Sequence, residues 1–125
     1  MRTCLVVDDS RVVRKVARRI LEDLQFTCDE AEDGMQAYNY CAHTMPEVIL
    51  LDWNMPVMSG IEFLEKLRAL PAGNDPRVVF CTTENDMAHI QRAMMAGANE
   101  YIMKPFDTDI IRSKFIQIGL LEDEN

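Results

Sequence analysis

The sequence predicts an α/β fold in which helices cover both faces of a doubly wound, five-stranded parallel sheet. Short apolar runs alternate with longer stretches of helical periodicity along the whole chain. Four of the runs are apolar at nearly every position, which is typical of strands that are buried on both faces. Right-handed crossover connections restrict such a chain to few topologies.

The strands are expected at five places along the chain. The four apolar runs cover residues 4–7, 48–51, 78–81 and 101–103. Residues 26–31 are more polar than the other runs. Because a central strand would be covered on both faces, this polar segment is expected at an edge of the sheet.

The helices are expected between and after these strands. Ser10 is a suitable N-cap for the first helix, and Gly97 is suited to end the fourth in a left-handed conformation. The helices should begin after Ser10, near Gly34, near Ser59, near Asp86 and after Pro105. The apolar face of the first helix comprises Val12, Val13, Val16, Ala17, Ile20, Leu21 and Leu24.

Length and composition indicate one globular domain. A chain of 125 residues can bury a core without disulfides or a structural metal. Hydrophobic residues make up 48% of it, and 21 acidic against 13 basic residues give a net charge of -8. Since an acidic surface repels nucleic acid, direct binding of DNA or RNA is not expected. We expect a single domain over residues 1–121, a short acidic tail over residues 122–125, and no output domain.

The cysteines and the N-terminus favour a cytoplasmic protein. Cys4, Cys28, Cys41 and Cys81 include no Cys-x-x-Cys pair, so they are expected to be buried free thiols in a reducing compartment. The first residues have the pattern of a core strand rather than of a signal segment. No apolar run approaches the length of a membrane span. We therefore expect a cytoplasmic monomer that does not insert into membranes.

Polar residues of different chemical kinds follow the four apolar strands. Asp8 and Asp9 follow one strand, and the next three are followed by Asp52, Thr82 and Lys104 in turn. Strand ends of the same polarity lie along one edge of a parallel sheet, so these groups should share one crevice. Three carboxylates, a hydroxyl and an ammonium group suit a divalent metal and a phosphoryl group.

The three acids favour a magnesium site over simple helix capping. Asp9 alone would be interpreted as a cap, because the helix dipole stabilises an acid at a helix N-terminus. Three acids at one point raise one another's pKa and destabilise the fold unless positive charge offsets them. Lys104 supplies one such charge. A hard divalent cation with oxygen ligands would supply the rest, which favours Mg²⁺ over zinc.

Asp52 is the candidate phosphoacceptor. A carboxylate can attack phosphorus and form an aspartyl phosphate. That reaction needs a metal on the phosphoryl oxygens and a cation opposite, and Lys104 is placed to be that cation. Thr82 can donate a hydrogen bond to a phosphoryl oxygen, although taken alone it would be an ordinary β-branched strand residue.

With these residues the chain resembles a response-regulator receiver domain, and more narrowly a single-domain chemotaxis regulator of the CheY type. The resemblance extends over essentially the full length. It rests on residues 7–10 (Val-Asp-Asp-Ser), residues 52–56 (Asp-Trp-Asn-Met-Pro), Gly60, Thr82 and residues 101–106 (Tyr-Ile-Met-Lys-Pro-Phe). It implies the flavodoxin-like strand order 2-1-3-4-5, for which CheY is a known example.

The resemblance also implies a ligand set for the metal. Asp9 and Asp52 resemble the side-chain ligands of Mg²⁺, and the backbone carbonyl of Asn54 resembles a third ligand. Asp8 resembles the acid that holds the metal through water. Mn²⁺ is expected to substitute for Mg²⁺.

Other residues resemble those that bind and sense the phosphoryl group. Lys104 resembles the lysine that pairs with it, and the amides of Asn54 and Thr83 are expected to contact its oxygens. Thr82 resembles the switch hydroxyl, and Tyr101 resembles the aromatic residue that turns inward when the switch closes. The bond between Lys104 and Pro105 is expected to be cis.

The function implied by the resemblance is that of a two-component response regulator rather than an enzyme. A histidine kinase or a histidine phosphotransfer protein would donate the phosphoryl group to Asp52. The surface of the fourth helix, fifth strand and fifth helix would then change shape and bind a target protein. The chemotaxis resemblance implies the flagellar motor switch or another regulator as that target. Because Asn54 cannot shuttle a proton and Glu84 would repel hydroxide, we expect slow self-dephosphorylation.

Other functions could use a similar fold. A phosphate sink or a phosphorelay shuttle needs the same crevice, so the sequence leaves these two alternatives open. An aspartate-nucleophile phosphatase of the haloacid dehalogenase type is disfavoured, because its general acid would stand where this chain has Asn54. FMN binding is rejected, because the turn over residues 8–11 is acidic and lacks a phosphate-binding loop.

The first helix carries five basic residues in an otherwise acidic protein. They are either ordinary solvated side chains or a patch that steers the histidine donor, which the resemblance places on this side of the domain. The five residues are Arg11, Arg14, Lys15, Arg18 and Arg19. His43 and His89 are expected to be surface residues away from the motifs.

Overall fold

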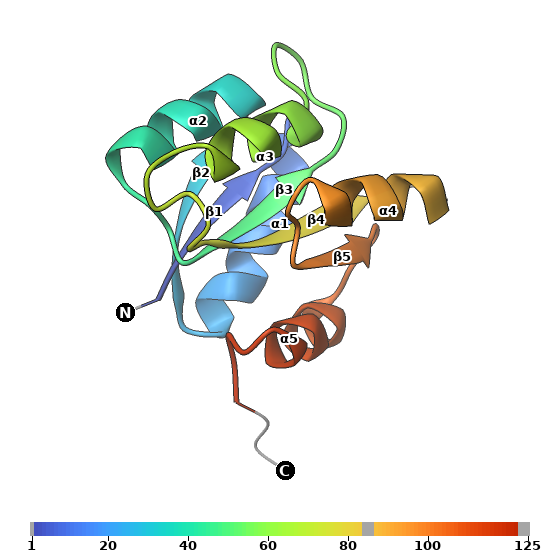
Figure 1. Ribbon diagram of the computed structural model, residues 1–125. Coiled ribbons are helices and arrows are strands. Elements are labelled where there is room, and N and C mark those ends of the chain that lie inside the picture. The colour runs from blue at the N-terminus through green and yellow to red at the C-terminus, as the bar shows by residue number, and fades with distance from the viewer. Residues whose placement is uncertain (1, 84–86, 123–125) are drawn as a thin grey trace.

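A single parallel sheet forms the middle layer of the protein, with helices packed above and below it (Figure 1). The computed structural model describes residues 2–83 and 87–122. The strands are β1 (Arg2–Val7), β2 (Phe26–Ala31), β3 (Val48–Asp52), β4 (Arg77–Thr82) and β5 (Glu100–Met103). Their order is β2-β1-β3-β4-β5, with every pair parallel. This confirms the predicted α/β class, the order and the edge position of β2.

Within the described residues, five helices alternate with the strands. They are α1 (Arg11–Asp23), α2 (Gly34–His43), α3 (Gly60–Arg68), α4 (Met87–Met95) and α5 (Thr108–Gln117). Side-chain caps satisfy the amides that have no partner within the first helical turn. Ser10 accepts a hydrogen bond from the amide of Val13 at 3.3 Å, as expected for the cap of α1. Gly97 follows α4 with φ +111°, the left-handed conformation expected there.

The core has two halves, one on each face of the sheet. Side chains of α2 and α3, with Ala93 of α4, pack against one face, which includes Leu5 and Val7. Side chains of α1 and α5 pack against the other face, which includes Cys4 and Val6. Because successive residues of a strand point to opposite faces, a strand covered on both sides is apolar throughout.

The cysteine prediction is confirmed, and the apolar face predicted for α1 is partly wrong. All four cysteines are buried and free. On α1, however, Val12 is 71% and Val16 is 47% exposed, whereas Ala17 and Leu21 are buried. The helix contacts the sheet through a narrower stripe than its apolar residues suggested, so two valines remain at the surface.

Some expectations fall outside the described residues. These are the start of the fourth helix near Asp86, the side chain of Glu84, and most of the acidic tail. Within the part of the chain that is described, no helix combines the length and apolarity that crossing a membrane requires.

Candidate functional site

The carboxyl ends of the central strands bring the predicted polar residues to one edge of the sheet. Asp8 follows β1, while Asp52 and Thr82 are the last residues of β3 and β4. Their exposed fractions are 3%, 8% and 5%, which is low for such polar side chains. The next helix approaches very closely here: a Cβ on Gly60 of α3 would overlap the Asp52 carbonyl oxygen and lie 2.9 Å from Phe80 Cε1.

The three acids form one cluster. Asp8, Asp9 and Asp52 each offer a carboxylate oxygen, and these oxygens all lie within 4.8 Å of one another. Asp9 is exposed, whereas the other two acids are buried. An all-oxygen donor set that is open to solvent on one side fits a hard cation such as Mg²⁺, which keeps some of its waters.

Lys104 links two of the acids. Its Nζ donates to Asp8 Oδ2 at 2.8 Å and to Asp52 Oδ1 at 2.9 Å. The backbone amide of Lys104 donates to the Thr82 carbonyl at 2.8 Å, which joins the end of β5 to the end of β4. The Lys104–Pro105 peptide bond is cis. These contacts bring an ammonium group from the fifth strand onto carboxylates that follow the first and third.

The electrostatics show that the acids compete for limited positive charge. Burial raises the pKa of Asp52, Lys104 works against this, and the charges of Asp8 and Asp9 add to the rise. Burial alone would lower the pKa of Lys104, but its hydrogen bonds to Asp8 and Asp52 outweigh burial and raise it. The pocket therefore keeps its lysine charged and disfavours the ionised form of Asp52, which is the condition that a bound cation would relieve.

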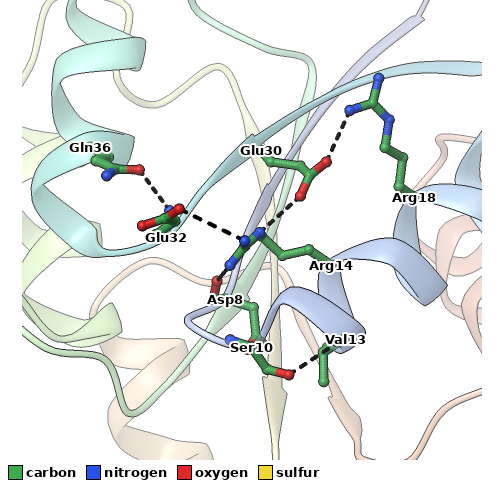
Figure 2. A network of polar contacts seen from close by, with 8 residues as sticks. All are labelled: Asp8, Ser10, Val13, Arg14, Arg18, Glu30, Glu32 and Gln36. Atoms are coloured by element: carbon green, nitrogen blue, oxygen red, sulfur yellow. Dashed lines mark hydrogen bonds and ion pairs between the residues drawn. The ribbon is translucent and has the colours of Figure 1, made fainter.

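Arg14 of α1, which the sequence analysis did not assign to the site, contacts the loop that carries Asp8 and Asp9. The Asp8 amide donates to the Ala31 carbonyl at 3.1 Å, and the Asp8 Oδ1 accepts from the Ser10 amide at 2.9 Å. Arg14 Nη1 donates to the Asp8 carbonyl at 2.6 Å (Figure 2).

Of the five basic residues on α1, Arg14 is thus not a solvated side chain, and the steering role given to the patch stays a prediction. Arg18, whose side chain is 39% exposed, pairs with Glu22 at 3.2 Å. It also pairs with Glu30 at 3.0 Å (Figure 2). The spacing Arg14, Ala17, Leu21 places Arg14 on the buried side of the helix, and this signal could have been recognised.

Arg11, Lys15 and Arg19 remain exposed on α1. Beside them, Val12, Val13 and Val16 line a groove of about 320 Å³ together with Thr83, Lys104, Pro105 and Phe106. The exposed valines thus lie next to the lysine of the acidic pocket.

The remaining predicted site residues surround the pocket. Asn54 and Thr83 are exposed, in the loops that follow β3 and β4. Tyr101 of β5 is half-buried, and Lys114 Nζ lies 5.1 Å from the centroid of its ring. The metal, phosphoryl and switch roles given to these residues stay predictions.

The prediction that His89 lies away from the motifs is wrong. The centroid of its ring lies 4.8 Å from that of Trp53, the residue after Asp52. Sequence distance hid this contact, because His89 lies on α4 and Trp53 lies in the loop that follows β3.

Comparisons with known proteins agree with this geometry. A family model described as the response regulator receiver domain matches residues 4–116. Over 112 residues the chain is 37% identical to a chemotaxis protein CheY homolog of Campylobacter jejuni, covering 88% of this chain and 86% of that protein.

Two solved structures share the fold. CheY4 of Vibrio cholerae matches with a TM-score of 0.89 and 29% identity, covering 94% of this chain and 98% of that chain. The receiver domain of a sensor histidine kinase from Pseudomonas aeruginosa, solved with a magnesium ion coordinated in its active-site cleft, has a TM-score of 0.86 and 25% identity, with coverage of 94% and 98%. The chain therefore belongs to the response-regulator receiver domain family and is similar to its CheY-type members.

Proposed function

We propose that this protein is a phosphorylation-switched response regulator that accepts a phosphoryl group on Asp52. The observation that carries the proposal is the contact of Lys104 with both Asp8 and Asp52, at 2.8 and 2.9 Å, beside the exposed carboxylate of Asp9. The cluster of three acids suits the binding of a cation. The ammonium group of Lys104 suits the binding of an anion such as a phosphoryl group.

Mg²⁺ is the proposed cofactor, with Mn²⁺ as a substitute. Asp9 and Asp52 would bind it by their side chains, Asn54 by its backbone carbonyl, and Asp8 through water. The cluster of acids supports this assignment, as does the magnesium ion coordinated in the related kinase receiver domain. When bound, the ion supplies charge neutralisation for the acids and for the phosphoryl oxygens.

The proposed transfer places each of the chain's own groups in a defined role. An Asp52 carboxylate oxygen attacks the phosphorus of a phosphohistidine donor. The phosphorus–nitrogen bond breaks, and its electron pair stays on the imidazole. Lys104, which now pairs with Asp52, moves its ammonium group to a phosphoryl oxygen, while the Thr82 hydroxyl and the amides of Asn54 and Thr83 donate to the others.

The donor, a histidine kinase or a histidine phosphotransfer protein, would dock beside α1. The exposed Val12 and Val16 line a groove that reaches Lys104, so an apolar contact there would bring the phosphohistidine to the pocket. The exposed basic residues next to the groove suit an acidic donor surface. They are Arg11, Lys15 and Arg19.

The output surface would be the face of α4, β5 and α5. Movement of Thr82 toward the phosphoryl group would leave space that the half-buried ring of Tyr101 can fill. Met87 and Met95 are 66% and 89% exposed on α4, and exposed methionines suit an adaptable protein interface. The chemotaxis relatives support a role in motility, with the flagellar motor switch or another regulator as target.

A phosphate sink or a phosphorelay shuttle would use the same pocket without this output surface. We further expect slow self-dephosphorylation, because Asn54 cannot shuttle a proton. An aspartyl phosphate that decays in less than a second would contradict that expectation. The free thiols suit the reducing cytoplasm, which is the proposed location.

Mass spectrometry tests the proposal directly. The protein is incubated with acetyl phosphate and Mg²⁺, and intact mass is measured beside a matched sample in EDTA and the variant Asp52→Asn. We expect only the wild type, and only in the sample that contains Mg²⁺ rather than EDTA, to gain the mass of one phosphoryl group. Labelling of Asp52→Asn to the same extent, or labelling that ignores Mg²⁺, would refute the assignment of Asp52.

A binding assay separates the signalling function from the sink. The variant Tyr101→Ala alters the proposed output surface but leaves the acidic pocket intact. A signaller should lose phosphorylation-dependent binding to its target, whereas a sink should still drain phosphoryl groups at the wild-type rate.

A further inference from the structure

Arg14 of α1 lies directly behind the acidic pocket. Only 7% of its surface is exposed, which is unusual for an arginine. Its Nη1 donates to the Asp8 carbonyl at 2.6 Å, and its Nε donates to Glu30 Oε1 at 2.8 Å (Figure 2). A planar guanidinium presents donors in fixed directions, so one side chain can hold a backbone carbonyl and a carboxylate at once.

The carbonyl that Arg14 contacts belongs to the peptide unit between Asp8 and Asp9. Its position therefore affects the backbone from which both carboxylates project. N-terminal to this peptide unit, the Asp8 amide donates to the Ala31 carbonyl of the edge strand β2 at 3.1 Å. C-terminal to it, the Ser10 amide donates to Asp8 Oδ1 at 2.9 Å. Arg14 adds the bond that fixes the orientation of the peptide between these two points.

Glu30 of β2 anchors the arginine and balances its charge. Its Oε1 accepts from Arg14 at 2.8 Å, and its Oε2 accepts from Arg18 Nη1 at 3.0 Å. Burial works to raise the pKa of Glu30, but the hydrogen bonds from Arg14 and Arg18 outweigh it and the pKa is lowered. An ionised Glu30 offsets the guanidinium charge, so Arg14 can stand behind a cation site with little repulsion toward the cation.

We propose that Arg14 is a positioning residue for the metal site, holding the peptide between Asp8 and Asp9 so that both carboxylates face one divalent cation. The inference rests on the proposed function, because it assumes that the acids bind Mg²⁺. Residues that orient metal ligands without touching the metal typically change metal affinity 10- to 100-fold when they are replaced.

The test is a Mg²⁺ titration followed by Trp53 fluorescence on the folded, full-length chain. The variants are Arg14→Gln, which removes the guanidinium group that donates to Asp8 and Glu30, and Arg14→Lys, which keeps the charge but lacks the planar guanidinium that holds both groups at once. The matched control is Arg18→Gln, which loses the same charge and a bond to the same Glu30 but does not contact Asp8. Circular dichroism establishes that each variant is folded at the titration temperature.

We expect the Mg²⁺ dissociation constant to rise at least tenfold in Arg14→Gln, about fivefold or more in Arg14→Lys, and less than twofold in Arg18→Gln. If Arg14→Gln does not fold, the Mg²⁺ dissociation constants of Arg14→Lys and Arg18→Gln are compared instead. Wild-type affinity in the Arg14 variants, or equal weakening in Arg18→Gln, overturns the inference and leaves the proposed function standing. A wild-type protein that binds no Mg²⁺ overturns both.

Discussion

Replacing Lys104 with methionine tests whether the acidic pocket depends on positive charge for its stability. Lys104 contacts Asp8 at 2.8 Å and Asp52 at 2.9 Å, and the side chains of both acids are at most 10% exposed. Removing one partner of a buried ion pair costs about 3–5 kcal/mol, because the remaining charge is left without compensation. We expect Lys104→Met to lower the free energy of unfolding by about 3–4 kcal/mol at pH 7 without metal.

Proton uptake sets an upper limit on this loss. In the variant, Asp52 can take up a proton when its ionised form would cost more free energy than protonation does. At pH 7 that costs about 4 kcal/mol, since an ordinary aspartate pKa lies roughly three units lower and each unit is worth about 1.4 kcal/mol. The folded variant would then bind more protons than the unfolded chain, so its stability should rise as the pH falls. The deficit relative to wild type should shrink by about 1.4 kcal/mol per pH unit between pH 7 and pH 5.

Urea unfolding followed by circular dichroism measures this effect, in EDTA and in excess MgCl₂. Mg²⁺ at 100 times its dissociation constant should return about 2.7 kcal/mol to the variant. Lys114→Met is the control, because it removes the same charge from an ion pair with Glu100 at 3.5 Å outside the pocket. That partly exposed pair should contribute less than about 1 kcal/mol. A Lys104→Met protein as stable as wild type in EDTA, or a deficit that ignores both pH and Mg²⁺, would refute this account of the pocket.

Three further substitutions probe the pocket and its surroundings. Asp52→Asn should raise the melting temperature in EDTA at pH 7, because burial and the neighbouring acids raise the pKa of Asp52 and its ionised form is destabilising. Scanning fluorimetry should show this gain shrinking as the pH falls through the raised pKa of Asp52, because the wild-type acid is then protonated as well. Gly60→Ala should cost about 3 kcal/mol or more in urea unfolding, since the added methyl group would overlap the Asp52 carbonyl and press on Phe80, and an unchanged midpoint would contradict the close approach of α3. His89→Ala should change the emission of Trp53, whose ring centroid lies 4.8 Å from that of the imidazole, and an identical spectrum would speak against this contact in solution.

The sheet and the location of the pocket could be predicted because both depend on short-range patterns. Leu5 and Val6 point to opposite faces and both are buried, so an uninterrupted apolar run was sufficient to indicate a parallel strand. In a parallel sheet the residues that follow the strands must meet at one edge. Asp52 and Lys104 could therefore be placed together although 52 positions separate them in the chain.

The sequence by itself determined the order of strands and helices, the edge that carries the polar groups, and the acidic character of the pocket. Only the tertiary structure decided which side chains of α1 support the pocket and which face solvent. Periodicity defines a face of a helix but not the angle or depth at which the helix docks. Docking buried Arg14 against Glu30 and Asp8, and it left Val12 exposed beside Lys104. Such contacts join different elements, so their energies depend on a relative placement that no local pattern encodes.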